Sequence, residues 1–300
     1  MPPKTAMPKP AEAHVTDIAD LGIVVSATTK IFVNASVLRN ASKVFRIMLG
    51  PDFLEGHTIV NSSNRQIPFI DLPEDKPKAM LTLMRLLHHR HRDIELAGQL
   101  ECNVVHEIAV LADKYDVCDA VRSVLATLPI ALDQAPPKDL WYVLSAAYLV
   151  GHRGAFSNIS VQLLLEGSVP FLDLVRECKT RRDSDLWMAA MHEAKRSQLC
   201  TKVSREIIDR MGVIISESGP IKHAEDFTNY VYMGEDYPLG RTIQELKNAV
   251  GTRPTTEDPT TVETLLEGLE NDIAEGICFD CVGNFGVHTG QHDPATKCIF

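Results

Sequence analysis

The sequence predicts an α+β domain at the N-terminus, with a small mixed sheet capped by helices, followed by a mostly α-helical C-terminal domain. Two observations lead to this prediction. Short β-branched runs, which are typical of strands, lie in the N-terminal part of the chain. Later segments repeat apolar residues at i, i+3, i+4 and i+7, which is the spacing of an amphipathic helix.

Three segments have the pattern of strands. Residues 20–26, DLGIVVS, and residues 30–34, KIFVN, are separated by a short turn and predict a hairpin. Residues 66–72, QIPFIDL, predict a third strand. Pro68 has no backbone N–H, so we expect this third strand at an edge of the sheet, or Pro68 at a position where the missing N–H is harmless.

The stretch that follows the hairpin, ASVLRNASKVF, starts a helix twice. Ser36 and Ser42 are both suitable N-caps, because a serine hydroxyl accepts a backbone N–H of the first turn. Gly50 and Pro51 then end the second helix. We therefore expect one helical turn over residues 37–40 and a second short helix over residues 43–49.

Apolar stripes predict three longer helices after the third strand. Their members are Met80, Leu83, Met84 and Leu87; Val105, Ile108, Ala109, Ala112 and Tyr115; and Val117, Val121, Val124, Leu125 and Leu128. Beyond a segment with a proline pair the patterns are almost all helical, with separate stripes over residues 186–194 and 203–211.

These patterns divide the chain into five parts. We expect a disordered tail over 1–13, the α+β domain over 14–130, a linker over 131–139, a helical domain over 140–250 and an acidic region over 251–300. Residues 241–300 hold ten acidic and four basic residues, so they carry −6 of the net charge of −10. A chain of this charge is not expected to bind nucleic acid.

The sequence predicts neither a secretory signal nor a membrane-spanning segment. The first residues lack the apolar core of a secretory signal. The longest mostly apolar run, residues 143–150, is too short to cross a bilayer. We therefore expect an intracellular protein, cytoplasmic or nuclear, that does not bind membranes and whose seven cysteines are thiols or metal ligands.

Several of these features together resemble a BTB/POZ domain over residues 19–129. They are Asp20 before the first strand, Val37-Leu38, Ser42 with Phe45, the D-L-P sequence at 71–73 and the A-D-K-Y sequence at 112–115. The whole chain is similar to the short BTB proteins of filamentous fungi. The resemblance implies a protein–protein interaction module, an adaptor or scaffold, and not an enzyme. BTB domains commonly form homodimers, and many deliver a substrate to the cullin scaffold of a ubiquitin ligase.

The chain departs from the family at three places. Asn34 stands where the family often has histidine, and at most one helical turn over 14–19 precedes the first strand. The hydrophobic–any–glutamate triplet of cullin-binding members is matched here only by Leu72-Pro73-Glu74. We place the partner surface around the following helix and the loop to Asp93. The candidate partner-binding residues are Glu74, Asp75, Lys78, His88 and Arg90.

A cysteine and histidine cluster near the C-terminus suggests a structural zinc. Cys278 and Cys281 form a C-x₂-C hook, which presents two thiolates to one ion. The remaining ligands would come from His288, His292 and Cys298. An alternative function is thus a zinc-dependent regulator or enzyme, against the plain interpretation of an acidic tail. A transcriptional regulator is a further alternative, although the chain has neither DNA-binding fingers nor a basic region.

Overall fold

The computed structural model describes residues 11–26, 29–53, 55–57, 67–125, 135–166, 169–178 and 182–218, with residues 132, 268, 271 and 277. The chain divides into two compact units. Unit 1 comprises Met1–Ala135 and Ser145–His152, and unit 2 comprises Pro136–Leu144 and Arg153–Phe300. The fold is mixed α+β, with a small sheet near the N-terminus and helices in most of the remaining described chain.

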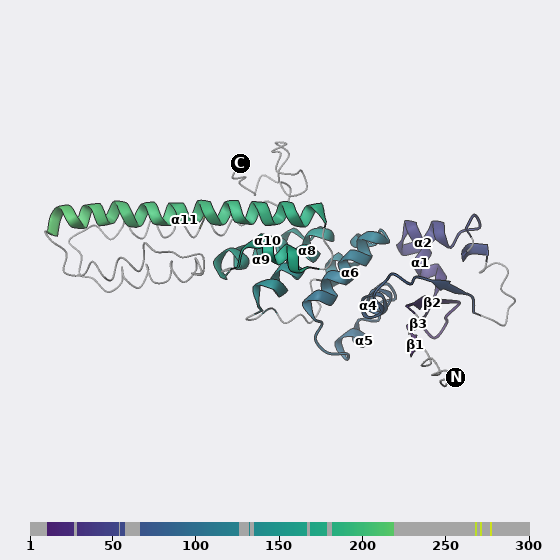
Figure 1. The fold of residues 1–300 in the computed structure, drawn as a ribbon. Coiled ribbons are helices and arrows are strands. Elements are labelled where there is room, and N and C mark those ends of the chain that lie inside the picture. Colours follow the sequence, from purple (N-terminus) through teal and green to yellow (C-terminus); the bar gives the residue numbers. More distant parts are fainter. Residues whose placement is uncertain are drawn as a thin grey trace, which may run out of the picture. The chain divides into compact units, whose positions relative to one another are not determined.

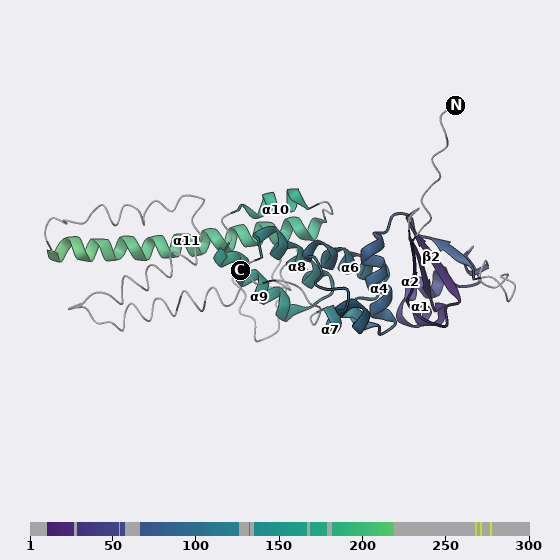
Figure 2. The ribbon, with the colours of Figure 1, turned by 90° about the horizontal axis from the view of Figure 1, so that it is seen from below.

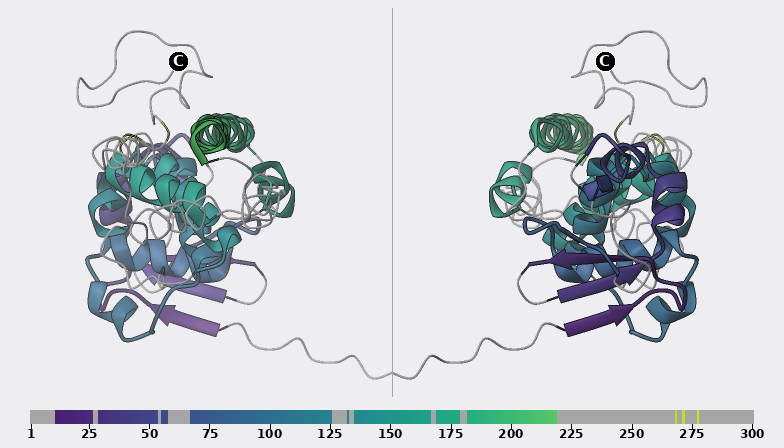
Figure 3. Two further views of the ribbon diagram at one scale, coloured as in Figure 1. Left: turned by 90° about the vertical axis from the view of Figure 1, so that its left-hand side faces the viewer. Right: turned by 90° about the vertical axis from the view of Figure 1, so that its right-hand side faces the viewer.

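The sheet of unit 1 has four strands in the order β1-β3-β2-β4 (Figure 3). Strands β2 (Leu21–Val25) and β3 (Thr29–Val33) pair antiparallel, which confirms the predicted hairpin. Strand β4 (Phe69–Asp71) pairs parallel with β2 and lies at an edge, as Pro68 predicted. Ile23 is opposite both Ile31 and Ile70, and all three side chains are buried on the inner face.

Strand β1 (Ala11–His14) pairs parallel with β3. The sequence predicted a disordered tail over 1–13, and for Ala11 to Ala13 this prediction is wrong. The segment AEAH has no strand pattern of its own, so its conformation depends on hydrogen bonds to β3. The His14 ring also stacks on Phe32, with 4.4 Å between ring centroids.

The helices of unit 1 cover the sheet and supply most of its core (Figure 1). Helices α4 and α6 pack against each other. The predicted apolar stripes of both helices are confirmed as core, since their side chains are almost completely buried. The helices are α1 (Ala35–Ala41), α2 (Lys43–Met48), α4 (Pro77–Leu87), α5 (His91–Glu95), α6 (Cys102–Lys114) and α7 (Cys118–Leu125).

Unit 2 is helical in its described part (Figure 2). Helix α8 (Pro137–Leu149), whose residues from Ser145 on belong to unit 1, begins inside the segment predicted as a linker, with Pro137 as its first residue. Helices α9 (Arg153–Glu166) and α10 (Phe171–Glu177) both contact α11. The two stripes predicted over 186–194 and 203–211 belong to one continuous helix, α11 (Asp183–Ser218).

No helix in the described part of the chain combines the length and apolar character needed to span a membrane.

Candidate protein-interaction surface

Helices α1 and α2 form a rigid pair through shared caps. The Asn34 side chain accepts from the N–H groups of Ser36 and Val37, so Asn34 caps α1, and the prediction of Ser36 as N-cap is wrong. Ser42 ends α1 through its N–H to Leu38 O, and its Oγ accepts from Phe45 N at 2.9 Å. The predicted cap at Ser42 is therefore confirmed, and one residue closes one helix and opens the next.

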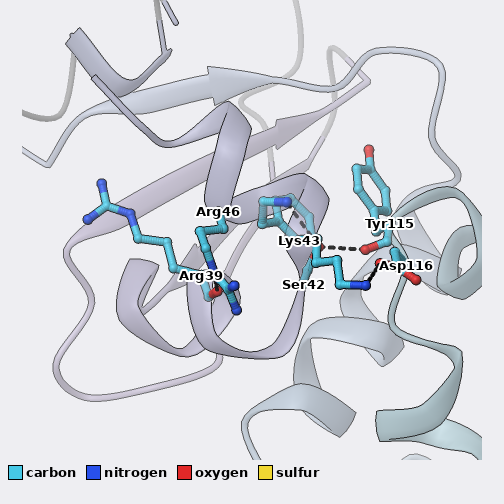
Figure 4. Close-up of polar contacts among 7 residues, drawn as sticks. Arg39, Ser42, Lys43, Arg46, Tyr115 and Asp116 are labelled. Carbon is cyan, nitrogen blue, oxygen red and sulfur yellow. Dashed lines mark hydrogen bonds and ion pairs between the residues drawn. The ribbon is translucent and has the colours of Figure 1, made fainter. Parts of the chain in front are cut away.

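Two arginines bind backbone carbonyls at the C-terminal ends of α1 and α2. Arg39 donates from Nη2 to Leu49 O at 2.5 Å, and Arg46 donates from Nε to Arg39 O at 3.0 Å. Each arginine thus satisfies a carbonyl at the C-terminal end of a short helix, where positive charge is favourable. Figure 4 shows the contact of Arg46 with Arg39. The pair of helices is held at both ends, so its outer side chains are presented from a fixed backbone.

The inner face of α2 packs against the end of α6. The Phe45 ring stacks on Tyr115, with 4.5 Å between centroids. Ser42 donates from Oγ to Tyr115 O at 2.5 Å (Figure 4). The Tyr115 hydroxyl in turn donates to Asp75 Oδ2. Burial, and then the neighbouring Asp75 carboxylate, raises the pKa of Tyr115, so its hydroxyl remains a donor.

The outer face of α2 leaves large apolar side chains in solvent. Val44 and Ile47 are one helical turn apart and are 37% and 59% exposed. Phe53, just after the helix, is 46% exposed. Lys43 and Arg46 of the same helix are also exposed, and Lys43 Nζ lies 3.9 Å from Asp116 Oδ2. We call this set, Lys43, Val44, Arg46, Ile47 and Phe53, the α2 surface.

No sequence motif singled out the α2 surface. The segment KVFRIM is apolar at four of its six positions, and a helix of one to two turns buries only one face. The excess of apolar residues in KVFRIM is the sequence signal that could have indicated the α2 surface. Two neighbouring glycines hold the following turn close to α2, because a Cβ at Gly56 would come within 1.6 Å of Gly50 O.

The predicted partner-binding residues lie at two ends of α4. Glu74 and Lys78 are exposed near its start, where Lys78 Nζ pairs with Glu101 Oε1 at 2.8 Å. His88 and Arg90 follow its end, so roughly 15 Å of helix separates the two groups. Arg90 pairs with Asp93 at 2.8 Å. The structure therefore does not gather these residues into one patch.

Asp75 is not the surface residue that the sequence predicted. Its side chain is 3% exposed, and its Oδ1 accepts from Lys114 Nζ at 2.6 Å. The remaining oxygen accepts from the Tyr115 hydroxyl. The carboxylate is buried because it joins the start of α4 to the end of α6, which are far apart in the sequence.

His88 is half-buried and holds two elements together. Its Nε2 accepts from Asn34 N at 3.1 Å, so the neutral ring carries its proton on Nδ1, which donates to Met84 O at 2.8 Å. Desolvation lowers the pKa of His88, although the Met84 carbonyl opposes this. His88 thus links the start of α1 to α4, and both ring nitrogens are already in use.

Unit 2 contains a buried polar chain of its own. Ser160 Oγ donates to His192 Nε2 at 3.1 Å and accepts from Ile277 N at 3.1 Å. His192 donates from Nδ1 to Met188 O at 2.7 Å. The Ser160 and His192 side chains are fully buried, so this serine and histidine join α9 to α11 without an open side for a substrate. No sequence motif marks the pair.

The predicted zinc ligands Cys278, Cys281, His288, His292 and Cys298 lie outside the described residues. Within the described part of the chain, no group of three or more histidine, cysteine or acidic side chains could hold a metal ion. None of the four cysteines described there forms a disulfide.

The chain matches no protein-family model and no curated protein sequence. Its membership of a family therefore stays a prediction from the residues quoted above.

Proposed function

We propose that the chain is a BTB/POZ-type adaptor that binds a protein partner through the α2 surface. The observation that carries this proposal is the exposure of Val44 and Ile47 on a helix pair fixed by caps, with Phe53 exposed just after it. Exposed apolar side chains grouped on a rigid element, with charged residues around them, are typical of binding surfaces. The order of hairpin, short helix pair, edge strand and helices agrees with the resemblance described above.

The chemistry of the α2 surface suggests what the partner presents. Burying Ile47 and Phe53 against another protein would remove apolar area from water, which favours binding. Helices α1 and α2 contain basic residues but no acidic one. A matching partner segment would therefore combine apolar side chains with a carboxylate near Arg46. A cullin scaffold is the partner class that the BTB resemblance implies.

The test is calorimetric binding of the full chain to the N-terminal domain of a cullin scaffold from the same organism. We expect a dissociation constant in the micromolar range or below, about −8 kcal/mol. Ile47→Asp and Phe53→Asp should each weaken binding at least about tenfold, because each buries a charge at the contact. Their unfolding free energies should change by less than about 1 kcal/mol, since both side chains are about half exposed.

Leu96→Asp is the matched control. Leu96 is apolar and 76% exposed, and it lies at the C-terminal end of α5, outside the α2 surface. The variant should leave binding unchanged. Lys78→Glu and Arg90→Glu test the two ends of α4 in the same assay. Loss of binding in these variants, with full binding by Ile47→Asp, would place the partner on the α4 ends. Absence of binding by the wild-type chain would exclude the cullin partner.

A further inference from the structure

Side chains from two other segments hold the backbone at the start of α1. Asn34 N donates to His88 Nε2 at 3.1 Å, and Ala35 N donates to Asp20 Oδ1 at 2.6 Å. His88 directly follows α4 and lies 54 residues from Asn34 in the sequence, whereas Asp20 directly precedes β2. The position of α1 relative to α4 therefore depends on the hydrogen bond that His88 accepts.

The contact of His88 with α1 requires the neutral form of the imidazole ring. The Nδ1 proton is donated to Met84 O at 2.8 Å, so Nε2 is the ring nitrogen that accepts the N–H of Asn34. A proton on Nε2 turns this nitrogen into a donor, and two N–H groups then face each other across 3.1 Å. The imidazolium form of His88 therefore cannot hold the start of α1.

The groups around His88 set the pH at which the ring gains this proton. Desolvation lowers the pKa of His88, the Met84 carbonyl opposes this, the charge of His89 lowers the pKa further and the Asp20 carboxylate raises it. In the described part of the chain, Asp20 and His89 are the titratable groups that act on His88. Two basic residues of the adjoining helices bind other groups: Arg39 binds Leu49 O, and Arg90 binds Asp93.

We propose that His88 is a pH-sensitive link, in which one proton on Nε2 releases the start of α1 from α4. The movement reaches α2 through two arginine contacts, because Arg39 donates to Leu49 O and Arg46 donates to Arg39 O. The α2 surface, which contains Arg46, is then held in its described position at neutral pH and is released in acid. The consequence for partner binding rests on the proposed function, whereas the release of α1 does not.

The test follows the His88 ring and the Asn34 amide of the full chain by nuclear magnetic resonance, from about pH 7.5 to about pH 4.5. We expect both signals to change with one common midpoint, which lies below pH 6.5 because the pKa of His88 is lowered. Once the ring is protonated, the protection of the Asn34 amide against hydrogen exchange should fall at least about tenfold relative to its intrinsic rate at that pH.

Two variants isolate the proton on His88. His88→Gln keeps an acceptor oxygen for Asn34 N but does not titrate, so its Asn34 amide should lose the acid response. His89→Asn is the matched control and should keep the response, because His89 is exposed and its φ of 57° is one that asparagine tolerates.

Three results would each overturn the inference: a His88 ring that stays neutral throughout, a protonated ring with an unchanged Asn34 amide, or an equal acid response in His88→Gln. The first two come from the wild-type chain, so they decide the matter even if His88→Gln fails to fold, which circular dichroism would reveal. None of these measurements needs a partner, so a negative result in the cullin-binding test leaves the link at His88 standing.

Discussion

Ser42 in unit 1 and Ser160 in unit 2 are both almost fully buried and use their hydroxyls in the same way. Each Oγ accepts one backbone N–H, from Phe45 or from Ile277. Each then donates to a group on another element, Tyr115 O for Ser42 and His192 Nε2 for Ser160. The difference lies in the acceptor, because a carbonyl does not titrate in water and an imidazole does.

The two serines also differ in the charge of the groups around them. Unit 1 buries a charge beside Ser42's acceptor residue, since Asp75 is ion-paired with Lys114 and bonded to Tyr115. In unit 2 the histidine beside Ser160 stays neutral: burial lowers the pKa of His192 to about 4, and only the Met188 carbonyl opposes this. The first cluster therefore depends on keeping an ion pair, and the second on excluding a proton.

The largest effect is expected from breaking the ion pair of the buried Asp75 carboxylate in unit 1. Lys114→Met leaves the Asp75 carboxylate buried without its cation, and should lower the unfolding free energy by about 4 kcal/mol. Urea denaturation at neutral pH measures this. Lys78→Met is the matched control, because the Lys78–Glu101 pair is of similar length but exposed, and it should cost less than about 0.5 kcal/mol. Equal effects would contradict the role assigned to Asp75.

Acid should weaken unit 2 through His192. Between pH 6.5 and about pH 4, His192 binds a proton in the unfolded chain but not in the folded chain. The free energy of unfolding therefore falls as the pH falls through this window. The expected loss is about 3 kcal/mol, and it is complete below the folded pKa. The lowered pKa of His88 acts in the same direction in unit 1.

The His192→Gln variant isolates this effect from the titration of carboxylates. Glutamine still offers an oxygen to the Ser160 hydroxyl but does not titrate. Hydrogen exchange of α9 and α11 at pH 7 and pH 4.5 should show acid-induced opening in the wild type and much less in the variant. The same acid response in both proteins would show that His192 is not its source.

The smallest effect is expected from removing the Ser42 hydroxyl. Ser42→Ala loses the N-cap of α2 and the bond to Tyr115 O, and should cost about 2 kcal/mol at any pH between 5 and 8. Thermal unfolding across this pH range measures it. Ser36→Ala is the control, since Ser36 is exposed and its side chain does not cap α1, so it should cost less than about 0.5 kcal/mol.

The sequence determined those elements whose signals are local. The hairpin of β2 and β3, the stripes of α4 and α6 and the cap at Ser42 depend on residues within one or two turns of each other, and period and capping chemistry were enough to predict them. The edge position of β4 followed in the same way, because Pro68 lacks the donor that a central strand needs.

Tertiary structure decided the features that depend on contacts between distant residues. Strand β1 forms because β3 lies beside it, and Asp75 is buried because Lys114 and Tyr115 reach it from another helix. Asn34 rather than Ser36 caps α1 because Asp20 and His88 bind the backbone at that point, through Ala35 N and Asn34 N. The exposure of Ile47 likewise depends on which face of α2 packs against Tyr115, and no local pattern specifies that choice.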